Sequence, residues 1–428
     1  MDSYKQKSCD FCCISDEDQA SPSSTGNEFD FKDPFLFCPQ QTLAFVDGMQ
    51  ADSNWTNYRA LILRDVDLGI AYAQLRALPQ LPNVRHIGII VDNVTLRDVG
   101  SSMTDYLGNA KDYHIAQKIT TISLTGTPSG PTVKDCEMML FAVSLTLLDV
   151  PSLQYVSNTS HYLPDPVIRH MNNISKLRFL RISGSVLPTN IAIRSPMLEE
   201  LVFADNSPSR ATKLVLQSPG LKRLEANVSK LEFGDSSSLD YISLANVQSV
   251  ELPMVCNPKI VQLHSCSSAA LVLCRASSLE ELLVSYMDDV ELRPESSVRV
   301  LYVQKSKNLS LVAHARRPLE VLVLSDVEFT LSQPDIHAKR VWLEFGSVNP
   351  VALFRINLQS TTHLGTYSMN SSYDHAIKKI RRRIGNSDFV TVCSTGSLEN
   401  RRATKHAWMA MHGYESTLLT EYSFVLGR

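Results

Sequence analysis

The segment LEELLV at residues 279–284 has an aliphatic residue at its first, fourth and sixth positions, which is the pattern LxxLxL. Eight other segments approximate this pattern, with starts about 20 residues apart. In order, the nine segments are LRFLRI (177–182), LEELVF (198–203), LKRLEA (221–226), LDYISL (239–244), IVQLHS (260–265), LEELLV (279–284), VRVLYV (298–303), LEVLVL (319–324) and AKRVWL (338–343). A short period repeated this often predicts a repeat architecture.

Each repeat contains a second alternating segment about ten residues further on, such as Leu214 with Leu216 and Leu231 with Phe233. Alternation with period two predicts strands, and the Pro-, Ser- and Asn-rich segments between them predict turns. One coil of two strands cannot bury its own apolar side, whereas stacked coils share a core and add about 4.8 Å each. We therefore predict a solenoid of stacked parallel strands over residues 177–345, with coils of about 20 residues.

The LxxLxL segments resemble those of the leucine-rich repeat superfamily, closely over 177–345 and loosely over 55–165. The Asn that follows LxxLxL in that superfamily is mostly missing here, with hints at LANV (244–247) and FADN (203–206). The superfamily's asparagine ladder is therefore not carried over. The nearly helix-free coils are similar to the irregular BspA-like or F-box-adaptor repeats. The resemblance implies a leucine-rich-repeat-like solenoid whose sheet surface binds other proteins.

The sequence on the N-terminal side of these repeats differs in character. Residues 1–35 contain eight acidic residues and three lysines, together with the segment SPSSTG, and we predict a disordered acidic tail. Residues 36–176 alternate strand-like segments, near 58–68, 84–96 and 118–126, with stretches of helical periodicity. We predict irregular repeats that carry helices and join the later coils in one solenoid.

The repeat pattern decays after residue 345. Residues 374–384 have the periodicity of a helix, and residues 388–394 have that of a strand. The end of a solenoid exposes apolar core and unpaired strand edge, so it requires a cover. We predict that residues 346–428 form a small α/β C-terminal cap or a small appended domain.

Composition and charge exclude several classes of protein. The chain is 44% hydrophobic and 20% charged, which excludes collagen, coiled coil and disorder throughout. A net charge of −3 gives no broad positive field for nucleic acid. The first residues lack the apolar core of a secretory signal, and the longest apolar run, 138–143, is too short to span a bilayer. We expect a cytoplasmic protein, with the nucleus or peripheral attachment to a membrane as alternatives.

One face of the predicted sheet carries an apolar patch. Residues on either side of the fourth LxxLxL position point away from the solenoid core, because side chains alternate along a strand. These positions are mixed and polar in the first five coils and mainly apolar or aromatic in the last four. The patch consists of Leu283, Val300, Tyr302, Val321, Val323 and Trp342. It predicts a protein-binding surface with Tyr and Trp as anchors. The alternatives are core covered by the C-terminal segment, or a strand register shifted by one residue.

A basic run, KKIRRR, occupies residues 378–383 within the predicted C-terminal helix. It alternates with isoleucines, which predicts a helix with one apolar stripe and one basic face. The basic face consists of Lys378, Lys379, Arg381, Arg382 and Arg383. Its interpretations are a nuclear-import signal, a contact to RNA or phosphate, a contact to an acidic partner, or a solvated helix face.

The chain has nine cysteines, an odd number, and lacks two CxxC motifs at zinc-site spacing, so we expect reduced thiols. Cys9, Cys12 and Cys13 form the one local cluster. It suits a lipid anchor made by S-acylation, because two or more acyl chains hold a protein that has no spanning helix. The alternatives are a metal site completed by Cys38, or an unstructured segment with neither role.

The sequence lacks the usual catalytic motifs: GxGxxG, GxxxxGK[ST], GxSxG, HExxH and the EF-hand loop are all absent. His264 beside Cys266 is the nearest approach to a nucleophile pair, and nothing around it predicts an enclosed pocket. We predict no enzyme activity, cofactor, metal or small-molecule substrate. Our first hypothesis is a scaffold that binds proteins on its solenoid sheet. The alternatives are a substrate-recognition subunit of a ubiquitin ligase, or a structural or lipid-anchored coat or cytoskeletal component.

Overall fold

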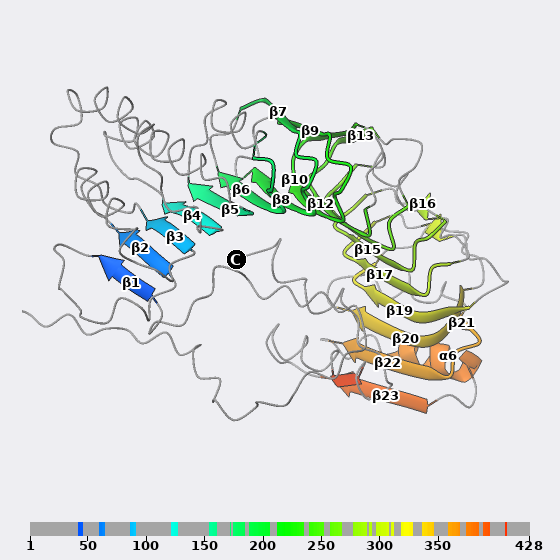
Figure 1. The fold of residues 1–428 in the computed structure, drawn as a ribbon. Helices are drawn as coiled ribbons and strands as arrows, with labels where there is room; N and C mark the ends of the chain where they lie inside the picture. Colours follow the sequence, from blue (N-terminus) through cyan, green and yellow to red (C-terminus); the bar gives the residue numbers. More distant parts are fainter. Residues whose placement is uncertain are drawn as a thin grey trace, which may run out of the picture. The chain divides into compact units, whose positions relative to one another are not determined.

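Parallel strands make up most of the described structure in both units of the chain, Met1–Val156 and Ser157–Arg428, in a computed structural model (Figure 1). The structure describes residues 42–45, 60–64, 86–90, 121–126, 154–160, 172, 174–184, 188–205, 212–234, 239–251, 257–267, 277–288, 291–292, 297–307, 310–311, 318–327, 336–345, 358–368, 374–384, 388–393 and 407–408.

In the described part of the first unit, four short strands pair in parallel, each with the next along the chain. They are β1 (Thr42–Phe45), β2 (Ala60–Arg64), β3 (His86–Ile90) and β4 (Thr121–Gly126). The last three coincide with predicted strand segments. The predicted acidic tail and the predicted helices of this region lie outside the described residues. Strand β5 (Tyr155–Ser160) begins at the boundary between the units, and a single solenoid that joins the two regions stays a prediction.

The second unit is built on a main sheet of parallel strands. They are β6 (Phe179–Gly184), β8 (Glu200–Asp205), β10 (Arg223–Asn227), β12 (Tyr241–Ala245), β14 (Ile260–His264), β15 (Glu281–Ser285), β17 (Val300–Gln304), β19 (Leu319–Ser325), β20 (Ile336–Phe345), β22 (His363–Ser368) and β23 (Asp388–Cys393). Each strand pairs with the next in parallel, so Leu224 lies between Leu201 and Ile242. This confirms the predicted parallel β-solenoid with stacked coils.

A second strand is present in several coils, whereas the segments predicted at 271–273 and 329–331 lie outside the described residues. A four-stranded parallel sheet consists of β7 (Asn190–Ile193), β9 (Lys213–Leu216), β11 (Lys230–Phe233) and β13 (Ser249–Glu251). Two later coils contribute the pair β16 (Glu291–Leu292) and β18 (Ser310–Leu311). Short β21 (Leu358–Gln359) pairs with the start of β20. Figure 1 shows β7, β9 and β13 above the main-sheet strands β6, β8, β10 and β12, and the core lies between the two layers.

The apolar positions of the LxxLxL pattern are the side chains that each coil contributes to this core. In the coil of β10, Leu221 lies in the turn before the strand, while Leu224 and Ala226 point inward from the strand, and all three side chains are buried. Leu214 and Leu216 of the second sheet are buried as well. Burial of a leucine side chain stabilises the fold by about 1.5–3 kcal/mol. The pattern repeats because every coil meets the same core.

Proline sets the turn that leads into two of the strands. In SPML (195–198) and SPGL (218–221), the Leu N–H donates to the Ser carbonyl three residues earlier, at 3.3 Å and 3.1 Å. Proline is favoured at the second position of such turns because its φ angle is already suitable. The turn places the side chain of the first LxxLxL leucine in the core.

A backbone corner follows five successive strands of the main sheet. The residues directly after β12, β14, β15, β17 and β19 have positive φ angles of 58°, 50°, 54°, 45° and 50°; they are Asn246, Ser265, Tyr286, Lys305 and Asp326. Their N–H groups still donate to the next coil, as Asn246 does to the carbonyl of His264 at 2.9 Å. The corner directs the next side chain into the core. These buried side chains are Val247, Cys266, Met287, Ser306 and Val327.

The structure differs from the prediction at the C-terminal boundary. The helix is present as α6 (Asp374–Ile384) and the strand as β23. However, β22 pairs in parallel with β20, and β23 pairs in parallel with β22. The main sheet therefore continues past residue 345 into the segment predicted as a cap. Pairing of strands uses backbone groups, which every residue has, so the sheet extends where the leucine pattern has decayed.

Candidate functional site

The candidate site is the front face of the main sheet, which we define as the face turned away from the second sheet. Its central row runs across the strands through residues that pair directly with one another. In order, this row is Arg181, Val202, Glu225, Ser243, Gln262, Leu283, Tyr302, Val323, Trp342 and Gly365. The row changes from mixed and polar to apolar at Leu283, as the sequence predicts.

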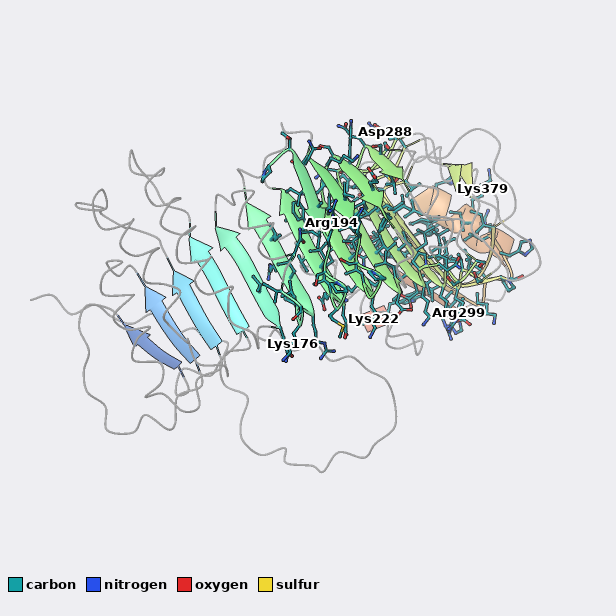
Figure 2. All side chains as sticks on the ribbon, turned by 45° about the horizontal axis from the view of Figure 1, so that its top comes forward. Lys176, Arg194, Lys222, Asp288, Arg299 and Lys379 are labelled. Atoms are coloured by element: carbon teal, nitrogen blue, oxygen red, sulfur yellow. The ribbon has the colours of Figure 1, made fainter. Side chains whose placement is uncertain are left out.

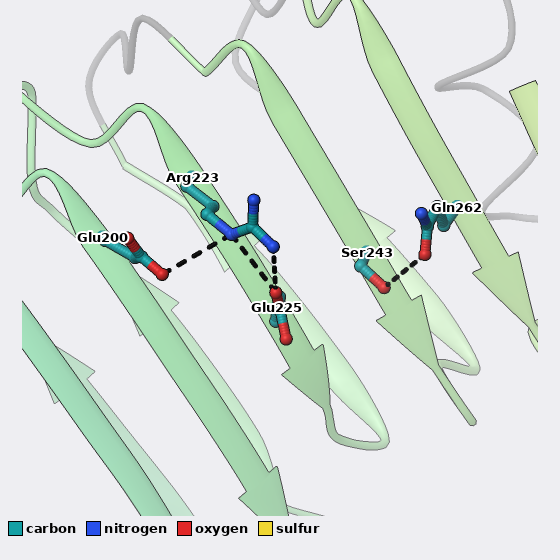
Figure 3. A network of polar contacts seen from close by, with 5 residues as sticks. All are labelled: Glu200, Arg223, Glu225, Ser243 and Gln262. Carbon is teal, nitrogen blue, oxygen red and sulfur yellow. Dashed lines mark hydrogen bonds and ion pairs between the residues drawn. The ribbon is translucent and has the colours of Figure 1, made fainter. Parts of the chain in front are cut away.

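An ion-pair network lies on the early part of the front face (Figure 3). The Arg223 guanidinium lies 2.6 Å from Oε1 of Glu225 and 3.5 Å from Oε1 of Glu200. It also lies over the ring of Tyr241, 4.1 Å from the centroid. The three charged side chains leave a net charge of −1, and the guanidinium is held by two carboxylates and one aromatic ring.

Uncharged polar side chains continue the row on the next two strands. Ser243 Oγ donates to Gln262 Oε1 at 3.3 Å, as Figure 3 shows. Both residues are buried, and Gln262 Nε2 has no hydrogen-bond partner among the residues that the structure describes. The front face therefore carries a buried amide donor between its charged part and its apolar part.

An aromatic and basic group lies at the ends of β14, β15 and β17. His264 Nδ1 is 2.9 Å from Ser285 Oγ, and the His264 ring packs edge-on against Tyr286 at 4.8 Å. Lys305 Nζ donates to the Tyr286 hydroxyl at 2.7 Å and lies over its ring. Tyr286 is 42% exposed, and among the described residues only Met197 is another large hydrophobic side chain with such exposure. We call Tyr286, His264 and Lys305 the corner cluster.

The corner cluster does not have the chemistry of a nucleophile site. Burial lowers the pKa of His264, which favours a neutral imidazole. Its partner Ser285 is completely buried, so a substrate has no access to that hydroxyl. Cys266, suggested by the sequence as a neighbour of His264 on the surface, is instead buried beyond the corner, because the backbone turns at Ser265. Burial raises the pKa of the Cys266 thiol to about 11.

The apolar patch predicted from the sequence is assembled by the structure, and it is buried. Its six residues are at most 5% exposed and belong to one cluster with Tyr367 and Trp408. The Trp408 ring lies 5.3 Å from that of Trp342. The prediction that these side chains face solvent is therefore wrong, because Trp408, far along the chain, packs onto the same face. Trp408, in the described part of the C-terminal segment, packs against the patch at Trp342, which agrees with part of the alternative interpretation.

One repeat segment has a register different from the one read in the sequence. Tyr241 pairs with Ile260, and Leu244 pairs with Leu263. The LxxLxL unit of this coil therefore begins at residue 258, two residues before IVQLHS. Gln262, and not His264, lies beside Ser243 on the front face, and His264 takes the position next to the corner.

The basic run lies on α6. The side chains of Lys378, Lys379 and Arg382 are exposed, whereas Ile377 and Ile380 are buried, so the predicted division into a basic and an apolar face is present. Arg381 and Arg383 lie in the same helix, but their side chains are outside the described part of the chain. What the basic face binds stays a prediction.

Other predicted features fall outside what the structure describes. Cys9, Cys12 and Cys13, with the lipid anchor predicted there, lie in a segment that is not described. Within the described ranges, no group of three or more His, Cys, Asp and Glu side chains has the arrangement of a metal site. In the same ranges, no helix has both the length and the apolar character needed to cross a membrane.

Sequence reasoning missed a row of alternating charges along the edge where the main strands begin. Each residue immediately precedes the front-face positions of its strand; the row is Arg178, Glu199, Lys222, Asp240, Lys259, Glu280, Arg299, Glu320 and Lys339. Ion pairs link neighbours, including Arg178 with Glu199 at 2.9 Å and Arg299 with Glu320 at 2.8 Å. Figure 2 shows Lys222 and Arg299 along the same edge. We call this row the charge ladder.

The signal for the charge ladder is present in the sequence. It occupies the second position of LxxLxL, which alternates in sign from coil to coil once the segment at 260–265 is moved to begin at 258. The alternation itself would have revealed the correct register, because Lys259 has the sign that the row requires between Asp240 and Glu280.

Comparison with known proteins does not assign a family to this chain. The chain matches no protein-family model, and a search of curated proteins gives no match.

Proposed function

We propose that the chain is a non-enzymatic interaction or scaffold protein, which binds a protein partner through the corner cluster. Open sheet surfaces of stacked coils suit macromolecules better than small substrates, which require enclosed pockets. Tyr286 would be the anchor of the contact, and His264 and Lys305 its polar surroundings.

Tyr286 carries this proposal. A bulky residue with a φ of 54° is conformationally strained, and here its ring is also 42% exposed. Neither property improves the stability of the free chain. Tyrosine is one of the residue types that dominate binding energy at protein interfaces, and an exposed ring held by His264 and Lys305 is already ordered before contact.

We further propose that the solenoid is a member of the leucine-rich repeat superfamily, of an irregular, strand-only variety. The LxxLxL register of the main sheet supports this assignment. The superfamily's Asn position corresponds here to the buried position beyond each corner, which Val247, Cys266 and Met287 occupy in three coils. An apolar or thiol side chain at that position would replace the asparagine ladder with core packing.

The experiment compares the full chain with its Tyr286→Asn variant as bait in quantitative affinity purification. Asparagine tolerates positive φ and already occupies the same corner position as Asn246, so the variant keeps the fold and removes the ring. The control is Met197→Asn, because Met197 is 55% exposed but lies on a turn away from the corner cluster.

We expect a direct partner to lose at least about tenfold in affinity to Tyr286→Asn, measured by titration with the purified partner. The Met197→Asn variant should bind that partner as the wild type does. Equal binding of the partner by all three proteins would contradict the role of Tyr286, and turnover of a substrate by the chain would contradict the non-enzymatic assignment.

A further inference from the structure

Helix α6 exposes one continuous row of basic side chains. In the described part of the helix, the exposed side chains follow the spacing i, i+3, i+4 and i+7, which places them on one face; they are His375, Lys378, Lys379 and Arg382. Figure 2 labels Lys379 in this row. We call these four residues the basic ridge. It contains three described members of the predicted basic face and extends it by one turn to His375.

The opposite side of α6 fixes how the helix is seated. Ile377 and Ile380 lie on that side and are at most 5% exposed, and α6 packs against β21 (Figure 1). The basic ridge therefore points to solvent and not to the sheet. Since the apolar side is used in this packing, it is not free to enter a membrane interface, as a surface-bound amphipathic helix requires.

The charge of α6 is not balanced by its described surroundings. The helix contains five lysines and arginines and one acidic residue, Asp374, so its net charge is +4 with neutral histidine. Residues 358–368, which include β21, contain no acidic residue. Within the described ranges, the side chains of Lys378 and Arg382 take part in no ion pair. The ridge therefore presents positive charge to solvent.

The charge ladder shows that this chain arranges charges differently where they support the fold. In the ladder the sign alternates, and Arg299 lies 2.8 Å from Glu320. On α6, Lys378 and Arg382 are like charges one turn apart, and such pairs destabilise a helix. The helix dipole attracts cations in the last turn only, whereas Lys378 and Lys379 lie before it. A partner of opposite charge would remove the repulsion along the ridge.

The spacing of the ridge matches an acidic polypeptide. Lys378 and Arg382 are separated by about 6 Å along the helix axis, at 1.5 Å per residue. Alternate side chains of an extended segment are separated by about 6.6 Å, so carboxylates at every second residue would face both cations. Nucleic acid requires a broad positive surface, whereas the ridge covers two helical turns of a chain whose net charge is −3.

We propose that the basic ridge binds an acidic segment of a partner protein, with its carboxylates opposite Lys378 and Arg382. The inference is independent of the proposed function, because it concerns α6 and does not involve the corner cluster.

Binding of fluorescent poly-L-glutamate to the full chain, measured by anisotropy at low salt, tests the proposal. The double variant Lys378→Gln, Arg382→Gln removes two charges from the ridge. The matched control, Lys176→Gln, Arg194→Gln, removes two exposed charges from elsewhere in the second unit (Figure 2). We expect affinity to fall about fivefold or more in the ridge variant and less than about twofold in the control. The exchange Lys378→Arg, Arg382→Lys keeps the charge and should keep the affinity.

Several results would overturn the proposal. They are absence of poly-L-glutamate binding by the wild type, and an equal loss of affinity in the ridge variant and the control. Polyuridylate and phosphatidylserine vesicles are titrated in parallel. Tighter ridge-dependent binding of either would assign the ridge to nucleic acid or to a membrane surface instead.

Urea denaturation separates binding from folding. We expect the ridge variant to be at least as stable as the wild type, because it removes repulsion between like charges. A clearly less stable ridge variant would show that these charges serve the fold and would contradict the proposal.

Discussion

An added methyl group at Gly365, on β22 of the main sheet, would collide with two tryptophan rings. The nearest atoms to a Cβ are ring atoms of Trp342 at 2.3 Å and 2.7 Å and of Trp408 at 2.9 Å. Neither ring can move easily, because both are almost completely buried. We predict that Gly365→Ala lowers the free energy of unfolding by about 1–3 kcal/mol, the usual cost of overpacking, as measured by urea denaturation.

A smaller partner should relieve that collision. In a Trp342→Leu background, Gly365→Ala should cost clearly less than in the wild-type background, because the atoms nearest the new methyl group are gone. A cost that is the same in both backgrounds would show that the two residues do not interact and would contradict the packing described for Trp342.

Cys266 should be chemically inert in the folded chain. Its burial raises the thiol pKa to about 11, so almost no thiolate forms at neutral pH, and the thiolate is the reactive form. We predict that iodoacetamide does not modify Cys266 under native conditions and modifies it rapidly in urea, as peptide mass spectrometry would detect. Rapid native labelling would contradict the position assigned to it beyond the corner.

At the scale of elements, the charge ladder sets how neighbouring strands stack. Arg299 lies between Glu280 and Glu320, at 3.8 Å and 2.8 Å. We predict that Arg299→Glu lowers the free energy of unfolding by about 1–2 kcal/mol at low salt, through the loss of two exposed pairs and the new repulsion. Arg194→Glu, which replaces an exposed arginine outside the ladder, should cost less than about 0.5 kcal/mol. Equal effects in urea denaturation would mean that the ladder contributes nothing specific.

The ladder also predicts how stability depends on pH. The hydrogen bond from Arg178 is the main cause that lowers the pKa of Glu199, and the hydrogen bond from Arg299 does the same for Glu320. A carboxyl pKa that is lower in the folded state stabilises the fold above the unfolded pKa, about 4.3. That stabilisation is lost as the pH falls through the lowered pKa values.

The double variant Glu199→Gln, Glu320→Gln should therefore lose less stability than wild type between pH 7 and pH 3, in urea titrations at each pH. Because both pairs are partly exposed to solvent, which screens them, we expect a difference of about 1 kcal/mol or less. An acid sensitivity equal to that of wild type would contradict the contribution of these two pairs.

At the scale of the second unit, each coil contacts mainly its two neighbours. A substitution in one coil should therefore destabilise the adjacent coils before the distant ones. Leu244 is buried in the middle of the solenoid, between Leu263 and Ala226 on the adjacent strands. We predict that Leu244→Ala costs about 2–5 kcal/mol and that hydrogen exchange rises first in β10, β12 and β14. A uniform rise across all strands, up to β20, would indicate a single cooperative core instead of a stack.

Local sequence patterns specify the repeat, the stacked strands and the inward and outward positions of each coil. These follow from LxxLxL and from period-two alternation, which are local patterns, because each coil meets the same inner environment. Strand boundaries at 200–205, 223–227 and 281–285 agree with that reading. A single coil, at 260–265, was misplaced by two residues, because its inner Leu263 is preceded by apolar residues that fit either start.

Contacts between distant segments establish which side chains pack against the outward positions. Val323 and Trp342 lie in the same front-face row as Ser243, and Trp408, 66 residues after Trp342, packs into the apolar cluster at Trp342. The corner cluster likewise depends on stacking, since His264, Tyr286 and Lys305 come from three different coils. A local pattern specifies which way a side chain points from its own strand, whereas the covering of a face is a contact between segments distant in the chain.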